Sequence, residues 1–212
     1  MYAAVAIYII SLVLASQKGI LAMFVVLFPL IMGGLYSIKL PSVHKRIHGK
    51  EKYARLKDIP LVKNLTATTA WTVLMTFLPL VYLGGRMDSA FLCAFCLIYG
   101  RDLINTITFD IRDIEGDKAH NVITLPVILG LDKCRSILAS ANLAIFSLFT
   151  GAVFFGVMPS IAFFAVTLST IYTDFYLSLI PKKPDKVFLY EVLIDGEFIA
   201  FGIFASLGRL IP

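Results

Sequence analysis

The chain has 212 residues, of which 58% are hydrophobic and 16% are charged, and its mean hydropathy is +0.85. One soluble domain of this length cannot bury so much apolar surface, so the composition predicts an integral membrane protein. The formal net charge is +5, but the basic residues lie between apolar runs, and no phosphate-binding loop or nucleic-acid motif accompanies them. Membrane topology explains this charge, and we expect no nucleic-acid partner.

Long apolar segments predict transmembrane helices along most of the chain. A helix needs about 20 residues to cross a hydrocarbon core of about 30 Å, and the first segment is shorter than that. No linker divides the chain, so the predicted fold is one all-α domain over residues 1–212, a multipass bundle of about seven transmembrane helices. The predicted segments are 3–16, 20–35, 65–83, 90–109, 137–158, 161–180 and 187–207.

Basic residues are distributed unevenly between the loops. Eight lie in 37–63, four in 110–135 and three in 181–186, whereas the loops at the opposite ends of the helices hold single basic residues. Cytoplasmic loops carry the excess of lysine and arginine, so we expect these three loops in the cytoplasm, the N-terminus inside and the C-terminus outside. The basic loops also favour anionic membrane lipids as neighbours.

Residues 101–130 contain the densest group of carboxylates in the sequence. In a continuous helix, Asp102, Asp110, Asp113 and Asp117 would lie along one face. Like charges at this spacing repel one another, so we expect a compensating cation, either a metal ion or neighbouring basic side chains.

Arg101 precedes Asp110 by nine residues along the same segment. In a helix this spacing places Arg101 about 13 Å deeper in the membrane. An ionisable side chain at that depth is costly unless it is paired or lines a wet cavity, so Arg101, Asp102 and Asn105 predict a polar cavity that opens to the cytoplasm. Four more acids in the cytoplasmic halves or ends of helices are candidates to line it: Asp174, Glu191, Asp195 and Glu197.

Carboxylates at a water interface with basic residues nearby suit a polyphosphate that is held through Mg²⁺. Mg²⁺ accepts one or two carboxylates and bridges to phosphate oxygens, while lysine and arginine neutralise the remaining charge. Beside an apolar cavity, such a site suits a diphosphate with a long apolar tail, so the implied substrate is a prenyl diphosphate. Two alternatives remain open: a solvated acidic loop balanced by Arg112 and Lys118, and a transporter with an acidic ion pathway.

The sequence resembles the UbiA superfamily of intramembrane prenyltransferases. Residues 109–130, FDIRDIEGDKAHNVITLPVILG, resemble the second aspartate-rich motif of that superfamily, and residues 55–64, RLKDIPLVKN, resemble a further family segment. The resemblance implies nine transmembrane helices around a central cavity, with two aspartate-rich motifs that hold Mg²⁺ and the diphosphate near the cytoplasmic face. The prenyl group then passes to an aromatic ring or another small-molecule acceptor.

The resemblance also assigns roles to residues of this sequence. Asp110, Asp113 and Asp117 would be the catalytic and metal-binding residues, and Arg101 and Asn105 would line the substrate cavity. The other candidates to bind substrate are Lys57, Lys63, Tyr36, Arg112 and Lys118.

The family's first motif, of the form N-D-x-x-D-x-x-x-D, has no match in this sequence. Together with the short first segment, this leads to the expectation that the first two helices of the family fold are missing. The predicted function is Mg²⁺-dependent prenyl transfer within the membrane. The alternatives are a catalytically impaired protein that binds an ion or lipid, and one half of a split enzyme whose missing helical hairpin comes from a separate polypeptide.

Overall fold

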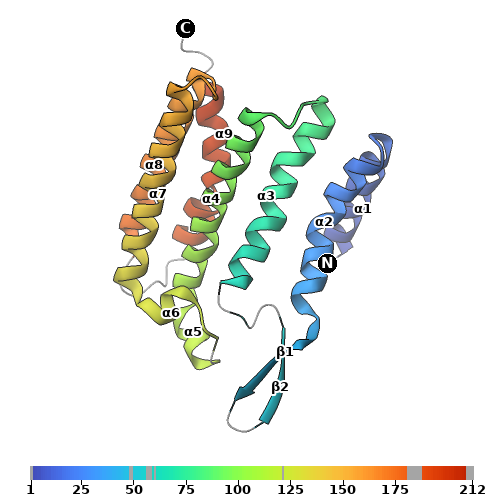
Figure 1. Cartoon of the computed structure of the whole chain (residues 1–212), viewed down its shortest axis with the longest axis vertical. Helices are drawn as coiled ribbons and strands as arrows, with labels where there is room; N and C mark the ends of the chain where they lie inside the picture. Colours follow the sequence, from blue (N-terminus) through green and yellow to red (C-terminus); the bar gives the residue numbers. More distant parts are fainter. Residues whose placement is uncertain are drawn as a thin grey trace. The chain divides into compact units, whose positions relative to one another are not determined.

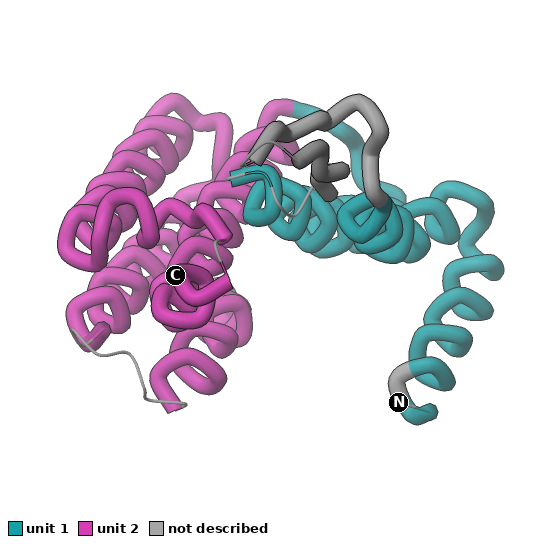
Figure 2. The backbone as a smooth tube through the Cα atoms, turned by 90° about the horizontal axis from the view of Figure 1, so that it is seen from below, with its two compact units in different colours: residues 1–88 teal, residues 89–212 magenta. Residues whose placement is uncertain are grey.

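The computed structural model comprises two compact units, residues 1–88 and 89–212 (Figure 2). Within each unit the helices pack against one another. The single domain expected from the sequence stays a prediction. The residues that the structure describes are 2–47, 50–55, 59, 61–120, 122–180 and 188–208.

Three apolar helices form the frame of the first unit (Figure 1). α1 (Tyr2–Gln17) packs against α2 (Ile20–Ser37), and α2 packs against α3 (Val62–Leu83). α3 ends because Gly84 adopts the left-handed conformation (φ 65°), and the Gly84 N–H donates to the carbonyl of Leu80. Glycine suits this position because it has no Cβ to oppose a positive φ.

A two-stranded antiparallel hairpin lies between α2 and α3 in the chain. Its strands are β1 (Lys39–Ile47) and β2 (Lys50–Arg55), and their register places Arg46 opposite Glu51. The sequence pattern predicts only a basic loop here, because these strands are polar and lack an alternating apolar face.

The second unit is a bundle whose longer helices pack in chain order. α4 (Ser89–Arg112) packs against α7 (Leu131–Phe154), α7 against α8 (Ser160–Leu179), and α8 against α9 (Glu197–Gly208), as Figure 1 shows. This order brings the middle of α4 close to residues of α8 and α9, although about 70 to 100 positions separate them in the chain.

Shorter elements complete the second unit. α5 (Ile114–Ala119) and α6 (Leu125–Leu129) connect α4 to α7, and the π-helical η2 (Leu189–Ile194) precedes α9. The helix predicted over 187–207 is thus interrupted between η2 and α9. Gly196 lies at the interruption, where a Cβ would collide with the carbonyl oxygen of Val192, so the bend requires glycine.

All seven apolar segments predicted from the sequence are helical over most of their length. Within the described part of the chain, α2, α3, α4, α7 and α8 are long and apolar enough to cross a membrane. α1 is a shorter apolar helix, and α9 has 12 residues. The predicted fold class, an all-α multipass helical bundle, is confirmed.

The largest buried apolar cluster lies where the C-terminal half of α4 meets α7, α8 and η2. Ile107 and Ile111 of α4 pack there with Leu138 of α7, Tyr176 of α8 and Ile194 of η2, and each of these residues is at most 6% exposed. Helices in a membrane associate through such close packing because lipid tails are themselves apolar. The cluster fixes the end of α4 that carries the aspartates.

Candidate functional site

The acidic stretch occupies the junction between α4 and α5. Asp110 is buried on the last turn of α4, Asp113 stands at the junction with φ −94° and ψ 8°, and Asp117 is half-buried on α5. The backbone still makes helical hydrogen bonds here, because the Asp113 N–H donates to the carbonyl of Phe109 at 3.2 Å. α4 ends at Arg112 and α5 begins at Ile114, so the condition of one continuous helix from 102 to 117 is not met in the structure.

Arg112 neutralises the carboxylate that follows it in the chain. Its Nε donates to Oδ1 of Asp113 at 2.9 Å, and its Nη2 donates to Oδ2 at 3.2 Å. The guanidinium carbon also lies 5.0 Å from the ring centre of Phe109 and 5.9 Å from that of Tyr190, within the range of cation–π attraction. Arg112 is therefore a compensating cation for the acidic stretch in this structure.

The aspartates do not form a complete metal site by themselves. Among the residues that the structure describes, no three histidine, cysteine, aspartate or glutamate side chains are grouped closely enough to hold a metal ion. Mg²⁺ commonly takes one or two protein carboxylates and completes its coordination with water and substrate phosphate. The donor set therefore fits a Mg²⁺ ion that arrives with a diphosphate, and the metal-binding and catalytic roles of these aspartates stay predictions.

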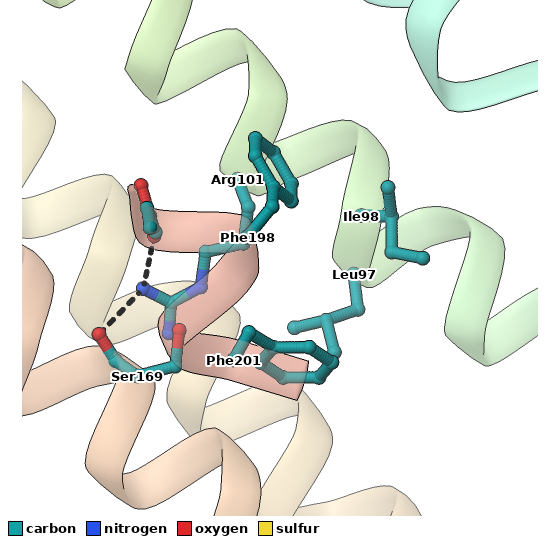
Figure 3. Close-up of a pocket in the computed structure, with 7 residues that line it drawn as sticks. Leu97, Ile98, Arg101, Ser169, Phe198 and Phe201 are labelled. Atoms are coloured by element: carbon teal, nitrogen blue, oxygen red, sulfur yellow. Dashed lines mark hydrogen bonds and ion pairs between the residues drawn. The ribbon is translucent and has the colours of Figure 1, made fainter. Parts of the chain in front are cut away.

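Arg101 is buried in the middle of the second unit and is paired with an acid (Figure 3). Its Nη1 lies 3.4 Å from Oε1 of Glu197 and donates to the carbonyl of Ser169 at 3.2 Å. The side chains of Arg101 and Glu197 are only 4% and 2% exposed. The pair joins the middle of α4 to the first residue of α9.

Hydroxyl groups of α8 add hydrogen bonds around this ion pair. Thr173 accepts a hydrogen bond from Nη1 of Arg101 and donates one of 2.7 Å to Oε1 of Glu197. Thr170 accepts from Nη2 of Arg101 at 2.7 Å, and the Tyr176 hydroxyl donates to Oε2 of Glu197 at 2.9 Å. Both carboxylate oxygens are thus hydrogen-bonded, which is the condition under which a buried charge is tolerated.

A small hollow lies beside this network. Its accessible walls are apolar, so the polar groups of Arg101 and Glu197 are turned toward each other and toward α8. Within this unit, the ion pair and its hydroxyl partners surround the guanidinium of Arg101, and the polar cavity that opens to the cytoplasm stays a prediction. The residues that line the hollow are Leu97, Ile98, Arg101, Ser169, Glu197, Phe198 and Phe201 (Figure 3).

Asn105 lies one turn closer to the aspartates and has a structural partner. Its Nδ2 donates to the carbonyl of Ile194 at 2.9 Å, and the Tyr172 hydroxyl donates to the neighbouring carbonyl of Leu193 at 2.7 Å. These carbonyls lie where η2 ends, and carbonyls at a helix end lack regular partners within the helix. Asn105 and Tyr172 therefore stabilise the interruption before α9.

The remaining predicted residues are spread over both units. Asp102 is buried on α4, and Lys118 is exposed on α5. Tyr36 and Lys63 are half-buried on α2 and α3 of the first unit. Lys57 lies outside the described residues.

Sequence reasoning missed several polar contacts on α7 and α8. Asn142 is fully buried and donates to Oδ1 of Asp174 at 2.8 Å, and Nε of Arg135 donates to the carbonyl of Leu177 at 3.0 Å near the end of α8. An asparagine inside an apolar run was the available signal for the first contact, because an unpaired amide is costly in a membrane.

Fold and site together define a class: a multipass helical membrane protein with carboxylates and an arginine at the end of one transmembrane helix. The model of the UbiA prenyltransferase family matches residues 1–191, so the chain belongs to that family. This confirms the resemblance drawn from the sequence.

Two curated relatives carry the same name, digeranylgeranylglyceryl phosphate synthase. The one from Pyrococcus furiosus is 39% identical over 87 residues, which cover 40% of this chain and 30% of the relative. The one from Thermococcus gammatolerans is 28% identical over 142 residues, which cover 66% of this chain and 44% of the relative. The matched part of the chain thus spans less than half the length of either relative, and no solved structure matches the chain.

Proposed function

We propose that this chain carries out Mg²⁺-dependent transfer of a prenyl group from a prenyl diphosphate to an acceptor within the membrane. The observation that carries the proposal is the α4–α5 junction: Asp110 lies on the last turn of α4, a helix long enough to span a membrane, and Asp113 and Asp117 follow that helix. Arg112 and Lys118 supply positive charge in the same stretch. Membership of the UbiA family supports prenyl transfer in general.

The proposed reaction exchanges one carbon–oxygen bond for another bond at the same carbon. The bond between C1 of the prenyl group and the diphosphate oxygen breaks, and the diphosphate leaves with the electron pair. C1 then bonds to a nucleophilic atom of the acceptor, such as a hydroxyl oxygen, which releases its proton to water. Bound Mg²⁺ would neutralise negative charge on the departing diphosphate.

The residues of the chain have separate tasks in this proposal. Asp113 and Asp117 are only partly buried and would bind the metal–diphosphate complex, whereas the buried Asp110 would support them from α4. Arg112 and Lys118 would donate charge-assisted hydrogen bonds to phosphate oxygens. The curated relatives are named for making digeranylgeranylglyceryl phosphate, which supports geranylgeranyl diphosphate as donor and a prenylated glyceryl phosphate as acceptor.

The orientation that we propose places the α4–α5 junction in the cytoplasm and the end of α9 on the opposite side, because the loops rich in lysine and arginine favour the cytoplasm. Alkaline phosphatase fused after Gly208 would then be active in Escherichia coli, and green fluorescent protein fused at the same place would be dark. The reverse pattern would contradict the orientation.

Purified full chain in lipid nanodiscs provides the direct test of the activity. With Mg²⁺, labelled geranylgeranyl diphosphate and geranylgeranylglyceryl phosphate, we expect formation of the doubly prenylated product and its loss when EDTA removes the metal. Absence of transfer to this acceptor and to aromatic acceptors would contradict the activity of the chain alone.

A binding measurement separates the alternatives if transfer fails. Calorimetry with a non-reactive thiol analogue of geranylgeranyl diphosphate, on the wild type and on Asp113→Asn, reports whether the aspartates at the α4–α5 junction bind the substrate without the family's first motif. Binding that requires Asp113 would support a split enzyme, in which a separate polypeptide supplies a second aspartate motif. No binding in either protein would leave only the ion- or lipid-binding alternative.

A further inference from the structure

We infer that Arg112 is an exchangeable counter-ion of Asp113. While it is paired with Asp113, Arg112 disfavours the binding of a divalent cation alone. When metal and diphosphate bind together, the guanidinium of Arg112 moves from the carboxylate to the phosphate. The inference rests on the proposed function and names how that site selects its ligand. It would make the site respond to the metal–diphosphate complex and not to free Mg²⁺.

The ion pair is well formed but readily broken. Two hydrogen bonds, of 2.9 and 3.2 Å, join the guanidinium of Arg112 to both carboxylate oxygens of Asp113. The two side chains are 38% and 45% exposed, so water competes for both groups. Exposed pairs of this kind contribute little net stability, and a stronger ligand can therefore displace one partner.

Two aromatic rings keep the guanidinium near the site when it leaves Asp113. The rings of Phe109 and Tyr190 lie 5.0 and 5.9 Å from the guanidinium carbon, and they belong to α4 and η2. Tyr190 is fully buried, and its hydroxyl has no hydrogen-bond partner among the described residues. The aromatic contacts limit the directions in which Arg112 can move, and the buried hydroxyl is a donor that no described residue uses.

The charges around Arg112 explain why it stays where it is without a ligand. Asp113, Glu191 and Asp195 all act on it electrostatically. Acids thus outnumber this arginine, and a divalent cation would be attracted to the same place. A metal ion that arrives alone must separate the ion pair and oppose the positive guanidinium, whereas a metal that brings a diphosphate offers the guanidinium new acceptors.

Metal binding without diphosphate tests the first half of the inference. Mn²⁺ replaces Mg²⁺ as the probe. Electron paramagnetic resonance measures the concentration of unbound Mn²⁺ in a solution of the full chain in neutral-lipid nanodiscs. We expect Arg112→Gln to bind Mn²⁺ about three- to tenfold more tightly than the wild type, because the competing cation is gone. Lys133→Gln removes the same charge from an exposed position on α7 and should change the affinity less than about twofold.

Binding of the diphosphate tests the second half. With Mg²⁺ present, the non-reactive thiol analogue of geranylgeranyl diphosphate should bind Arg112→Gln about tenfold more weakly, because one charge-assisted contact is lost. Arg112→Lys keeps the charge without the bidentate geometry, so we expect a smaller loss of about threefold. Opposite changes in the two affinities are the signature of exchange, since a purely structural role of Arg112 would weaken both.

A double variant identifies the carboxylate involved. In Arg112→Gln/Asp113→Asn, the gain in Mn²⁺ affinity should disappear, because the freed carboxylate no longer exists. Unchanged Mn²⁺ affinity in Arg112→Gln, or a loss of affinity for both probes, would overturn the inference. The Mn²⁺ measurement needs no prenyl substrate, so it tests the role of Arg112 even where the wild type fails to bind the diphosphate analogue, which would contradict the proposed function instead.

Discussion

Replacing Glu197 by alanine is expected to lower the free energy of unfolding by about 3 to 5 kcal/mol, because it leaves the Arg101 guanidinium buried without a counter-ion. The two side chains are 4% and 2% exposed, so water has little access with which to replace the lost carboxylate. Thr173 and Tyr176 also lose the acceptor to which their hydroxyls donate. Denaturant unfolding of the purified protein in detergent, followed by helical circular dichroism, measures the change.

An exposed acid near the same part of the chain serves as the control. Glu191 lies on the exposed side of η2, so Glu191→Ala should change the free energy of unfolding by less than about 0.5 kcal/mol. The double variant Arg101→Met/Glu197→Leu removes both charges and should recover most of the stability, since an apolar pair of similar size needs no desolvation. An equally small change in Glu197→Ala and Glu191→Ala would contradict the structural importance of the pair.

The positions of the helices could be predicted because long apolar runs dominate the sequence. Segments 20–35, 65–83 and 90–109 correspond closely to α2, α3 and α4, and the main difference is a few residues at each end. The interruption before α9 had a sequence signal, the turn-forming pair Asp195-Gly196 within an apolar run. Apolar composition outweighs that local signal in any prediction based on hydropathy alone.

The partner of Arg101 could not be identified from the sequence. Its predicted depth requires that Arg101 be paired or line a wet cavity, and Glu197 was one of four acids named as candidates to line that cavity. The choice depends on how α8 and α9 pack against α4, which sequence spacing does not determine. The structure brings Glu197 to Arg101, whereas it pairs Asp174 with Asn142 on α7.

The break between α4 and α5 within the acidic stretch could not be predicted from the sequence. The spacing from Asp110 to Asp117 is compatible with a continuous helix, and no proline or glycine marks the break at Asp113. The structure separates α4 from α5 at Asp113, and α5 and α6 then connect the chain to α7. In the structure Asp113 pairs with Arg112, a contact between adjacent residues that helical spacing would not predict.

The second large effect, a loss of prenyl-transfer activity, is expected on replacement of Asp113 or Asp117. Asp113→Asn and Asp117→Asn should each reduce kcat/KM for prenyl transfer by about 10²- to 10³-fold, because they remove a charge that the proposed metal–diphosphate complex requires. Neither residue is fully buried, so the unfolding free energy should change by less than about 1 kcal/mol. Steady-state assays with labelled geranylgeranyl diphosphate, together with unfolding curves of the same preparations, separate the two effects.

Glu115 provides a closely matched control for the aspartates. It lies on α5 between Asp113 and Asp117, carries the same charge and is exposed. If the carboxylates act only by making the junction acidic, Glu115→Gln should impair transfer as much as Asp113→Asn does. If Asp113 and Asp117 bind the metal–diphosphate complex directly, Glu115→Gln should change kcat/KM by less than about threefold, since a charge without contact to the ligand is screened by water and salt. Comparable losses in all three variants would therefore contradict direct binding by the two aspartates and favour a general electrostatic role of α5.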